Sequence, residues 1–475
     1  MTEASRSGLV VMKFGGTSMG SADRIRASAA LCAGEAGKRP VVTVVSAMSK
    51  VTDLLLDTLR HAEGGDRDGM ESNIATLAQR HRETCEELLP ENAREAVLAG
   101  IDELVSEFRR ISNGVHMLGE RPARSVDEAV AIGERLSALL MARYLQSRDF
   151  PAAAVNAREV IVTDAVFGNA TPLMGLTREK AAAALGPLLE KGILPVVTGF
   201  NGATADGRAT TLGRGGSDFS ASILAASLDA AELWIWSDVD GILSADPRLV
   251  PGARVLDLVT YAEAAELAYN GAKVLHPRTL APLVSRRIPV WSKNSFAPEK
   301  PGTKIVPAIP DPIGPRAVTS MANVALVSLE PASPELTGTK LMGRAFEALA
   351  ASGAEVLALT SSSYRQSFCF LVRGDELALA LQAVESALSL ELAHGYVKPV
   401  EVDTEVGLLA IVGEGMRGVT GMAGRIFTAV SREGVNVIAI AQGSSELTIA
   451  IVVRREGLEK AVRAVHEECG MGGPP

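Results

Sequence analysis

The sequence predicts an α/β fold, in which a mainly parallel sheet sandwiched by helices is followed by two smaller βαββαβ units. Between residue 8 and about residue 300, short apolar runs alternate with amphipathic helical patterns, as in parallel sheets covered on both faces. Beyond residue 316 the chain repeats itself at an offset of 81 positions. The predicted domains are therefore residues 1–308, 316–398 and 399–475.

Composition narrows the class of protein. With 475 residues, 47% hydrophobic and 22% charged, the chain has the make-up of a globular protein with several domains. A net charge of −9 argues against a nucleic-acid partner, and no apolar run reaches the roughly 18 residues of a membrane span. The N-terminus has no signal-peptide pattern, so we expect a cytoplasmic protein. The four cysteines are scattered, and we expect neither a disulfide framework nor a metal site.

The first predicted strand ends in a distinctive loop. The apolar run at residues 9–12 leads directly into Lys13, and Gly15, Gly16, Thr17 and Ser18 follow. An ammonium, two glycines and two hydroxyls after a buried strand can surround a polyphosphate. A plain glycine turn after a strand is the alternative.

The next elements supply two polar groups. A predicted strand at residues 41–46 ends in a loop that contains Ser46 and Thr52, although a turn with a capped helix would have the same pattern. Two helices are predicted between residues 70 and 113, either as a lobe over the substrate or as packing only.

Glu134 opens a further helix and lies off its apolar stripe, which by periodicity alone is typical of a solvated side chain.

A second glycine-rich loop precedes a predicted helix. Arg214 is followed by Gly215, Gly216, Ser217 and Asp218. Amides at the start of a helix bind anions, an arginine pairs with a carboxylate in a fork, and an aspartate there orients a lysine or a magnesium ion. A helix simply capped by Asp218 is the alternative.

Further motifs follow the strand predicted at residues 232–237. These motifs contain Ser237, Asp238, Leu243, Arg248, Lys273 and Val274. The proline-rich stretch at residues 298–315 is typical of a linker. After it, Gly343 aligns with Gly424 in the two repeats, each of which offers strand, helix, strand, strand, helix.

These motifs together resemble the aspartate kinases of the amino acid kinase family, which carry tandem regulatory ACT domains. The resemblance covers essentially the whole chain and implies transfer of phosphate from ATP, with magnesium held mainly by the ATP phosphates, to L-aspartate. It implies that Lys13 and Asp218 are catalytic, that Glu134 binds the substrate ammonium and that Arg214 binds its carboxylate. Other implied substrate contacts are Ser46, Thr52, Gly215, Gly216 and Ser217. Other implied ATP contacts are Gly15, Gly16, Thr17, Ser18, Ser237, Asp238, Leu243, Arg248, Lys273 and Val274.

In this chain Ser237 and Leu243 stand where the family usually has threonine and tyrosine, which weakens the expectation for the adenine and ribose contacts. Because the chain ends soon after the second repeat, we expect no fused dehydrogenase. Two rivals stay open. One is a kinase acting on glutamate or a nucleoside monophosphate, and the other is a silent amino-acid sensor, which would have lost Lys13, Arg214 or Asp218.

The repeats also give an expectation for regulation. Tandem ACT units bind amino acids in the family, whereas a duplicated cap without a ligand is the alternative. Lysine-inhibited relatives tend to place an aspartate where this chain has Leu357, and a buried ammonium without a carboxylate is costly. We therefore favour threonine over lysine as the effector and expect a homodimer or homotetramer formed through the ACT units. The expected effector residues are Gly343, Ser361, Gly424, Asn436 and Gln442.

Overall fold

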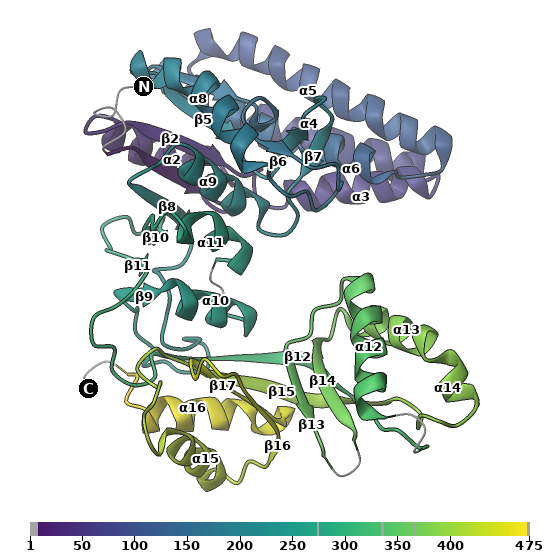
Figure 1. Ribbon diagram of the computed structural model, residues 1–475. Helices are drawn as coiled ribbons and strands as arrows, with labels where there is room; N and C mark the ends of the chain where they lie inside the picture. Colours follow the sequence, from purple (N-terminus) through teal and green to yellow (C-terminus); the bar gives the residue numbers. More distant parts are fainter. Residues whose placement is uncertain (1–7, 273–274, 334–336, 364–365, 473–475) are drawn as a thin grey trace. The chain divides into compact units, whose positions relative to one another are not determined.

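The computed structural model describes residues 8–272, 275–333, 337–363 and 366–472, and its contacts divide the chain into two compact units (Figure 1). The N-terminal unit comprises Met1–Ile242, Asp257–Tyr261 and Leu275–Ala308. The C-terminal unit comprises Leu243–Leu256, Ala262–Val274 and Ile309–Pro475. Two segments that precede residue 308 in sequence thus belong to the C-terminal unit.

The N-terminal unit is built on an eight-stranded sheet with the order β3-β5-β2-β1-β8-β10-β11-β9. Neighbouring strands are parallel except for the antiparallel pair of β10 and β11. The strands are β1 (Val10–Phe14), β2 (Val41–Val45), β3 (Ala152–Val155), β5 (Leu194–Thr198), β8 (Glu232–Ser237), β9 (Leu258–Thr260), β10 (Val290–Asn294) and β11 (Thr303–Val306). A small second sheet contains β4 (Val162–Thr163), β6 (Asn201–Thr204) and β7 (Ala209–Thr211). The predicted mainly parallel sheet is confirmed.

Helices connect these strands. They are α2 (Ala22–Ala36), α3 (Val51–Glu63), α4 (Arg67–Leu88), α5 (Glu91–Leu118), α6 (Ala123–Val130), α7 (Ile132–Ser147), α8 (Met174–Glu190), α9 (Gly216–Ser227) and α11 (Pro277–Val284), with a short 3-10 turn η1 (Ala157–Glu159). The two predicted helices between residues 70 and 113 are the core of α4 and α5. Both are long, and they lie side by side with α3 in Figure 1.

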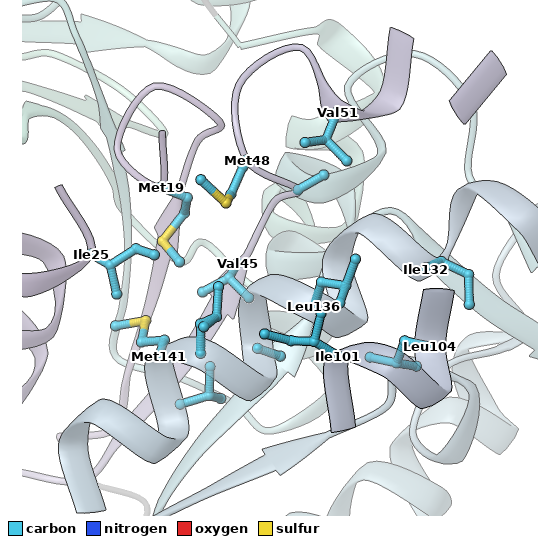
Figure 2. Packing of buried hydrophobic residues seen from close by; sticks show 14 of the residues in the cluster. Met19, Ile25, Val45, Met48, Val51, Ile101, Leu104, Ile132, Leu136 and Met141 are labelled. Atoms are coloured by element: carbon cyan, nitrogen blue, oxygen red, sulfur yellow. The ribbon is translucent and has the colours of Figure 1, made fainter. Parts of the chain in front are cut away.

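The largest hydrophobic cluster joins the sheet to these helices. Alternate residues of β1, namely Val10, Met12 and Phe14, are fully buried in it. Figure 2 shows Ile101 of α5 beside Leu136 of α7 within the same cluster. The helical pair α4 and α5 is therefore part of the main core of this unit.

Strand parity decides where Lys13 points. Successive side chains of a strand lie on opposite faces of the sheet, so Lys13 lies on the face opposite Met12 and Phe14. Helix α9 packs against β1, β2 and β8. Lys13 thus meets α9 at the carboxyl end of β1, where ligands bind in open parallel sheets.

The C-terminal unit contains an antiparallel six-stranded sheet with the order β13-β14-β12-β15-β17-β16. Its elements are α10 (Tyr261–Tyr269, from Ala262 onward), β12 (Ala317–Leu329), α12 (Gly338–Ser352), β13 (Ala358–Ser361), β14 (Phe368–Arg373), α13 (Leu377–Ala387), α14 (Ser389–Ala393), β15 (Glu401–Val412), α15 (Met422–Arg432), β16 (Val437–Gln442), β17 (Thr448–Arg454), η2 (Arg455–Gly457) and α16 (Leu458–Glu468). Each repeat supplies strand, helix, strand, strand, helix, as predicted. The two copies meet through β12 and β15, so that they share one sheet.

The interpretation of residues 298–315 as a linker is wrong in part. Thr303–Val306 forms β11, which pairs with β10 on one side and β9 on the other. The side chains of Thr303–Val306 alternate between buried and half-buried, as in a strand, and three of the four are β-branched. The prolines at positions 301 and 307 lie outside this run and do not interrupt its pairing. Within the described residues, no helix is long and apolar enough to cross a membrane.

Candidate active site

A cavity of about 310 Å³ lies at the carboxyl ends of β1 and β2 in the N-terminal unit. Segments far apart in the sequence contribute to its wall. Its lining consists of Lys13, Gly16, Ser46, Ala47, Met48, Ser49, Lys50, Thr52, Asp53, Glu134, Phe200, Gly215, Gly216, Ser217 and Asp218. The structure thus brings together both predicted catalytic residues and every predicted substrate-binding residue except Arg214, which is exposed in the loop next to the cavity.

An ion pair joins the two glycine-rich loops. Lys13 Nζ lies 2.5 Å from a carboxylate oxygen of Asp218, and the Lys13 side chain is only 10% exposed. Asp218 stands in the first turn of α9, where a carboxylate is also favoured by the helix dipole. This pairing holds the ammonium at the start of α9, beside the backbone amides that open that helix.

Glu134 is buried, and the interpretation of this residue as a solvated side chain is wrong. Its side chain is 2% exposed, and Ala47 N–H donates to Oε1 at 3.2 Å. Burial raises the pKa of Glu134 to about 7, against the opposing effects of the Ala47 amide and the Lys13 charge. Among the described residues, Oε2 has no hydrogen-bond partner. A buried carboxylate oxygen without a partner is suited to a cationic ligand.

Gly133 explains how this glutamate reaches the cavity. A Cβ at Gly133 would lie 2.8 Å from Ala47 Cβ and 3.2 Å from a methyl carbon of Val51. Only glycine permits so close an approach of α7 to the loop after β2. Figure 2 shows Met48 of that loop and Val51 at the start of α3 above Leu136 of α7. The Gly-Glu pair thus combines a close contact with a buried charge.

The second glycine-rich loop is tightly packed behind the cavity. Gly213 and Gly215, on either side of Arg214, have φ values of 75° and 70°, which disfavour other residues. A Cβ on Gly216 would lie 2.6 Å from the Phe200 ring, and one on Gly199 would lie 2.7 Å from Ser217 Cβ. Phe200 itself has a φ of 70°, a strained value for a bulky residue. The turn at residues 199–200 therefore fixes the start of α9.

The first glycine-rich loop is partly used by the protein itself. Gly15 N–H donates to the Trp236 carbonyl at 3.2 Å, and Ser18 Oγ lies 2.7 Å from Ser295 Oγ in the interior. Gly16 lines the cavity and Thr17 is exposed. Of the loop atoms predicted to surround phosphate, the Gly15 amide and the Ser18 hydroxyl thus have partners within the fold.

The loop after β2 contributes Ser46 to the cavity, and Thr52, which was predicted in that loop, lines the cavity from the first turn of α3. Lys50 in this loop has a left-handed conformation and precedes α3. Arg80 of α4 donates to the Ser49 carbonyl at 2.7 Å. The long helix α4 therefore supports the cavity through its backbone as well as packing in the core.

The predicted nucleotide residues are more dispersed. Ser237 ends β8 and accepts from Val239 N–H at 3.4 Å, and Asp238 after it is exposed. Leu243 and Arg248 belong to the C-terminal unit, where Arg248 pairs with Asp246 at 2.6 Å. Lys273 and Val274 lie outside the described residues. The structure thus tests the position of only some of these residues.

In the C-terminal unit, a cavity of about 150 Å³ lies at the start of α15. Gly424, Gln442, Glu446, Met422 and Ile449 are among its lining residues. Ser361 lines a separate cavity of about 380 Å³ at the end of β13.

The aligned glycines of the two repeats, Gly343 and Gly424, lie inside helices. Gly343 is the sixth residue of α12, and Gly424 is the third residue of α15. Asn436 directly precedes β16 and is not among the residues that line the cavity at α15. The glycine in each repeat marks a helix but not its first residue.

Comparison with known proteins identifies the family. A model described as the amino acid kinase family matches residues 8–294, and a model of the ACT domain matches residues 409–469. Lysine-sensitive aspartokinase 3 of Escherichia coli is 32% identical over 97% of this chain and 99% of its own length. This chain belongs to the aspartokinases. The bifunctional aspartokinase/homoserine dehydrogenase 1 of Arabidopsis thaliana is 34% identical over 96% of this chain, but the match spans only 50% of that longer relative.

The structures of relatives agree with this assignment. The crystal structure of E. coli aspartokinase III with aspartate and ADP in its R-state matches 97% of this chain at 31% identity, with a TM-score of 0.83. The T-state structure of the same enzyme with lysine and aspartate gives a TM-score of 0.80. The fold of this chain therefore agrees with that of E. coli aspartokinase III over nearly the whole length of both chains.

Several residues around the cavity were not found from the sequence. Phe200 and Gly199 lie in a turn without a recognisable motif, so their contacts with α9 could not be foreseen. Asp127 and Arg278 each bind backbone beside the second glycine-rich loop. Arg278 lies four residues after Val274, which the sequence had singled out, so this one residue could have been noticed.

Proposed function

We propose that this protein transfers the γ-phosphoryl group of ATP to the β-carboxylate of L-aspartate, giving ADP and 4-phospho-L-aspartate. The observation that carries the proposal is the single cavity lined by the Lys13–Asp218 ion pair and by the buried carboxylate of Glu134. The first pair provides a positive group for phosphate, and Glu134 provides a negative group for an ammonium. The related E. coli enzyme with bound aspartate and ADP supports the same pair of substrates.

The residues have distinct roles in the proposed reaction. A β-carboxylate oxygen attacks the γ-phosphorus, and the bond from that phosphorus to the oxygen bridging to ADP breaks. The acceptor carboxylate is already ionised at neutral pH, so the step needs no general base. Phosphoryl transfer then depends on positioning and on stabilising charge. Lys13 stabilises the charge of the transferred group, and Asp218 holds Lys13 in place.

Around these two residues, Glu134 binds the aspartate ammonium and Arg214 binds its α-carboxylate. Ser46, Thr52, Gly215, Gly216 and Ser217 complete the proposed acceptor site. Gly15, Gly16, Thr17, Ser18, Ser237, Asp238, Leu243, Arg248, Lys273 and Val274 form the proposed nucleotide site, of which Gly15 and Ser18 contribute mainly to loop shape. Magnesium is held mainly by phosphate oxygens, which are the hard ligands that it prefers.

Regulation is the second part of the proposal. We infer that threonine is the feedback effector rather than lysine, and that it acts through Gly343, Ser361, Gly424, Asn436 and Gln442. Leu357 precedes β13 and packs in an apolar cluster, which is a poor environment for an ammonium. The cavity at α15 is lined by the apolar Met422 and Ile449 beside Gln442, and its carboxylate, Glu446, already accepts from Gly418 N–H at 2.7 Å. The proposed setting is a cytoplasmic homo-oligomer that begins the synthesis of lysine, threonine and methionine.

ADP release in the presence of aspartate, glutamate, acetylglutamate or a nucleoside monophosphate tests the reaction. We expect turnover with aspartate and less than one hundredth of that rate with the other acceptors. Turnover of another acceptor would favour the rival kinase, and no turnover with any acceptor would favour the silent sensor.

The Lys13→Ala variant tests where the reaction takes place. Loss of one preorganised electrostatic group commonly lowers kcat about 100-fold to 1,000-fold. Lys38→Ala is the matched control, because Lys38 is an exposed lysine paired with Glu35 on the surface. A kcat for Lys13→Ala within threefold of the control would show that the cavity is not the active site.

A further inference from the structure

Arg278, on the first turn of α11, contacts both ends of the second glycine-rich loop. Its guanidinium donates to the Leu212 carbonyl at 3.2 Å, just before the loop, and lies 4.8 Å from the centre of the Phe219 ring, just after it. It also donates to the Ala170 carbonyl at 2.8 Å and to the Asn169 side chain. One planar, five-donor group thus fastens the loop to the neighbouring turn at residues 168–170.

Asp127, on α6, holds the same segment from another side. Its carboxylate is 1% exposed and accepts from the Thr211 amide at 2.9 Å and the Thr211 hydroxyl at 2.7 Å. It also accepts from Gly168 N–H at 2.9 Å. Three donors satisfy a carboxylate that burial alone would penalise, and burial raises its pKa. Asp127 and Arg278 therefore bind the same two pieces of chain, residues 168–170 and 211–212.

Between these fixed points the side chain of Arg214 is exposed. Its neighbours Gly213 and Gly215 both have positive φ, so the backbone there has a conformation that depends on glycine. A long, exposed arginine side chain has many accessible rotamers, and ordering it costs binding free energy. A Cβ at Gly213 would lie 2.7 Å from Asn169 Oδ1, so the 168–170 turn also forms one wall for the loop.

We propose that Arg278 and Asp127 are positioning residues that preorganise Arg214 for the α-carboxylate of the amino-acid acceptor. The proposal rests on the proposed role of Arg214. Neither residue lines the cavity, so each acts through the loop rather than on a substrate. Because Lys13 and the loop after β1 are held by other contacts, the effect should fall on the acceptor and not on ATP.

Steady-state kinetics of Arg278→Ala and Arg278→Lys test this inference. We expect Arg278→Ala to raise the KM for aspartate at least tenfold while the KM for ATP stays within twofold of wild type. Arg278→Lys should restore part of the loss, because lysine keeps the charge but not the planar fork. Arg286→Ala is the matched control, since Arg286 is a partly exposed arginine just after α11 that pairs with Asp229. Equal increases in both KM values, or an Arg278→Ala variant that matches the control, would overturn the proposal.

Asp127→Asn provides a second variant with nearly unchanged shape. An amide oxygen cannot accept all three hydrogen bonds in the same geometry, so we again expect the aspartate KM to rise more than the ATP KM. Hydrogen exchange of amides 211–219 tests whether Arg278 and Asp127 hold the loop, and it needs no turnover. We expect at least tenfold faster exchange in Arg278→Ala and Asp127→Asn than in Arg286→Ala. Unchanged exchange in both variants would refute the holding of the loop by Arg278 and Asp127. Faster exchange in both variants, combined with no turnover of aspartate by the wild type, would refute the proposed function instead.

Discussion

Replacing Glu134 by glutamine should make the N-terminal unit more stable at pH 8 while impairing the use of aspartate. Glu134 is 2% exposed, its Oε2 has no partner within the described part of the chain, and burial raises its pKa from 4.5 to about 7. A rise of this size corresponds to about 3 kcal/mol of unfolding free energy. The neutral amide of glutamine avoids this penalty, because it needs no buried charge.

The sign of the pH dependence follows from the same shift. The folded state holds the Glu134 proton more tightly than the unfolded chain does. The penalty is therefore absent below about pH 4.5, grows between pH 4.5 and 7, and is complete above about pH 7. We expect Glu134→Gln and wild type to have similar stability at pH 4.5, and the variant to be more stable by up to about 3 kcal/mol at pH 8.

Urea unfolding followed by tryptophan fluorescence can measure this difference. All three tryptophans, Trp234, Trp236 and Trp291, belong to the N-terminal unit, so their emission reports the unfolding of that unit. Glu103→Gln on the exposed side of α5 is the control for removing one carboxylate. A stability difference between Glu134→Gln and wild type that does not change from pH 4.5 to pH 8 would refute the assignment of a buried, partly unpaired charge.

Three further predictions concern ligands and assembly. Arg214→Ala and Glu134→Ala should each raise the KM for aspartate at least tenfold more than the KM for ATP. Equal effects on the two KM values in steady-state kinetics would show that these residues do not belong to the acceptor site. Threonine should inhibit the wild type with a coupling free energy of about 1 to 3 kcal/mol between effector and substrate. Inhibition titrations with threonine, lysine and methionine can measure it, and potent inhibition by lysine alone would contradict the argument from Leu357. Light scattering at micromolar concentration should give the mass of a homodimer or homotetramer, and a monomer with and without amino acids would exclude assembly through the ACT units.

Much of the fold could be predicted from the sequence, because most of its strands and helices have a recognisable local pattern of apolar residues. Continuous apolar runs predicted β1, β2 and β8, and the repeat offset predicted that the second half of the C-terminal sheet copies the first. The linker prediction failed at β11, because four residues between prolines carry too weak a period to outweigh them. A strand that is stabilised mainly by its neighbours β10 and β9 has no strong signal of its own.

The motifs that line the site could be predicted from the sequence, but the residues that hold these motifs in place could not. Lys13 and Asp218 were recognisable because glycine and charge occur together in short strings. Burial of Glu134 was not, because it results from the close approach of Gly133 to Ala47, which lies 86 residues away in sequence. Asp127 and Phe200 likewise act through long-range contacts with backbone, which leave no local pattern.

The central claim is that the β-carboxylate of aspartate accepts the phosphoryl group in the cavity lined by Lys13 and Glu134. The most direct measurement incubates the protein with ATP, magnesium, hydroxylamine and an equimolar mixture of aspartate, glutamate and acetylglutamate, and identifies the hydroxamates by mass spectrometry. We expect aspartate β-hydroxamate as the dominant product, formed in equal amount to ADP, with no such product from Lys13→Ala. A hydroxamate of glutamate or acetylglutamate, an α-hydroxamate of aspartate, or ADP release without any hydroxamate would contradict it.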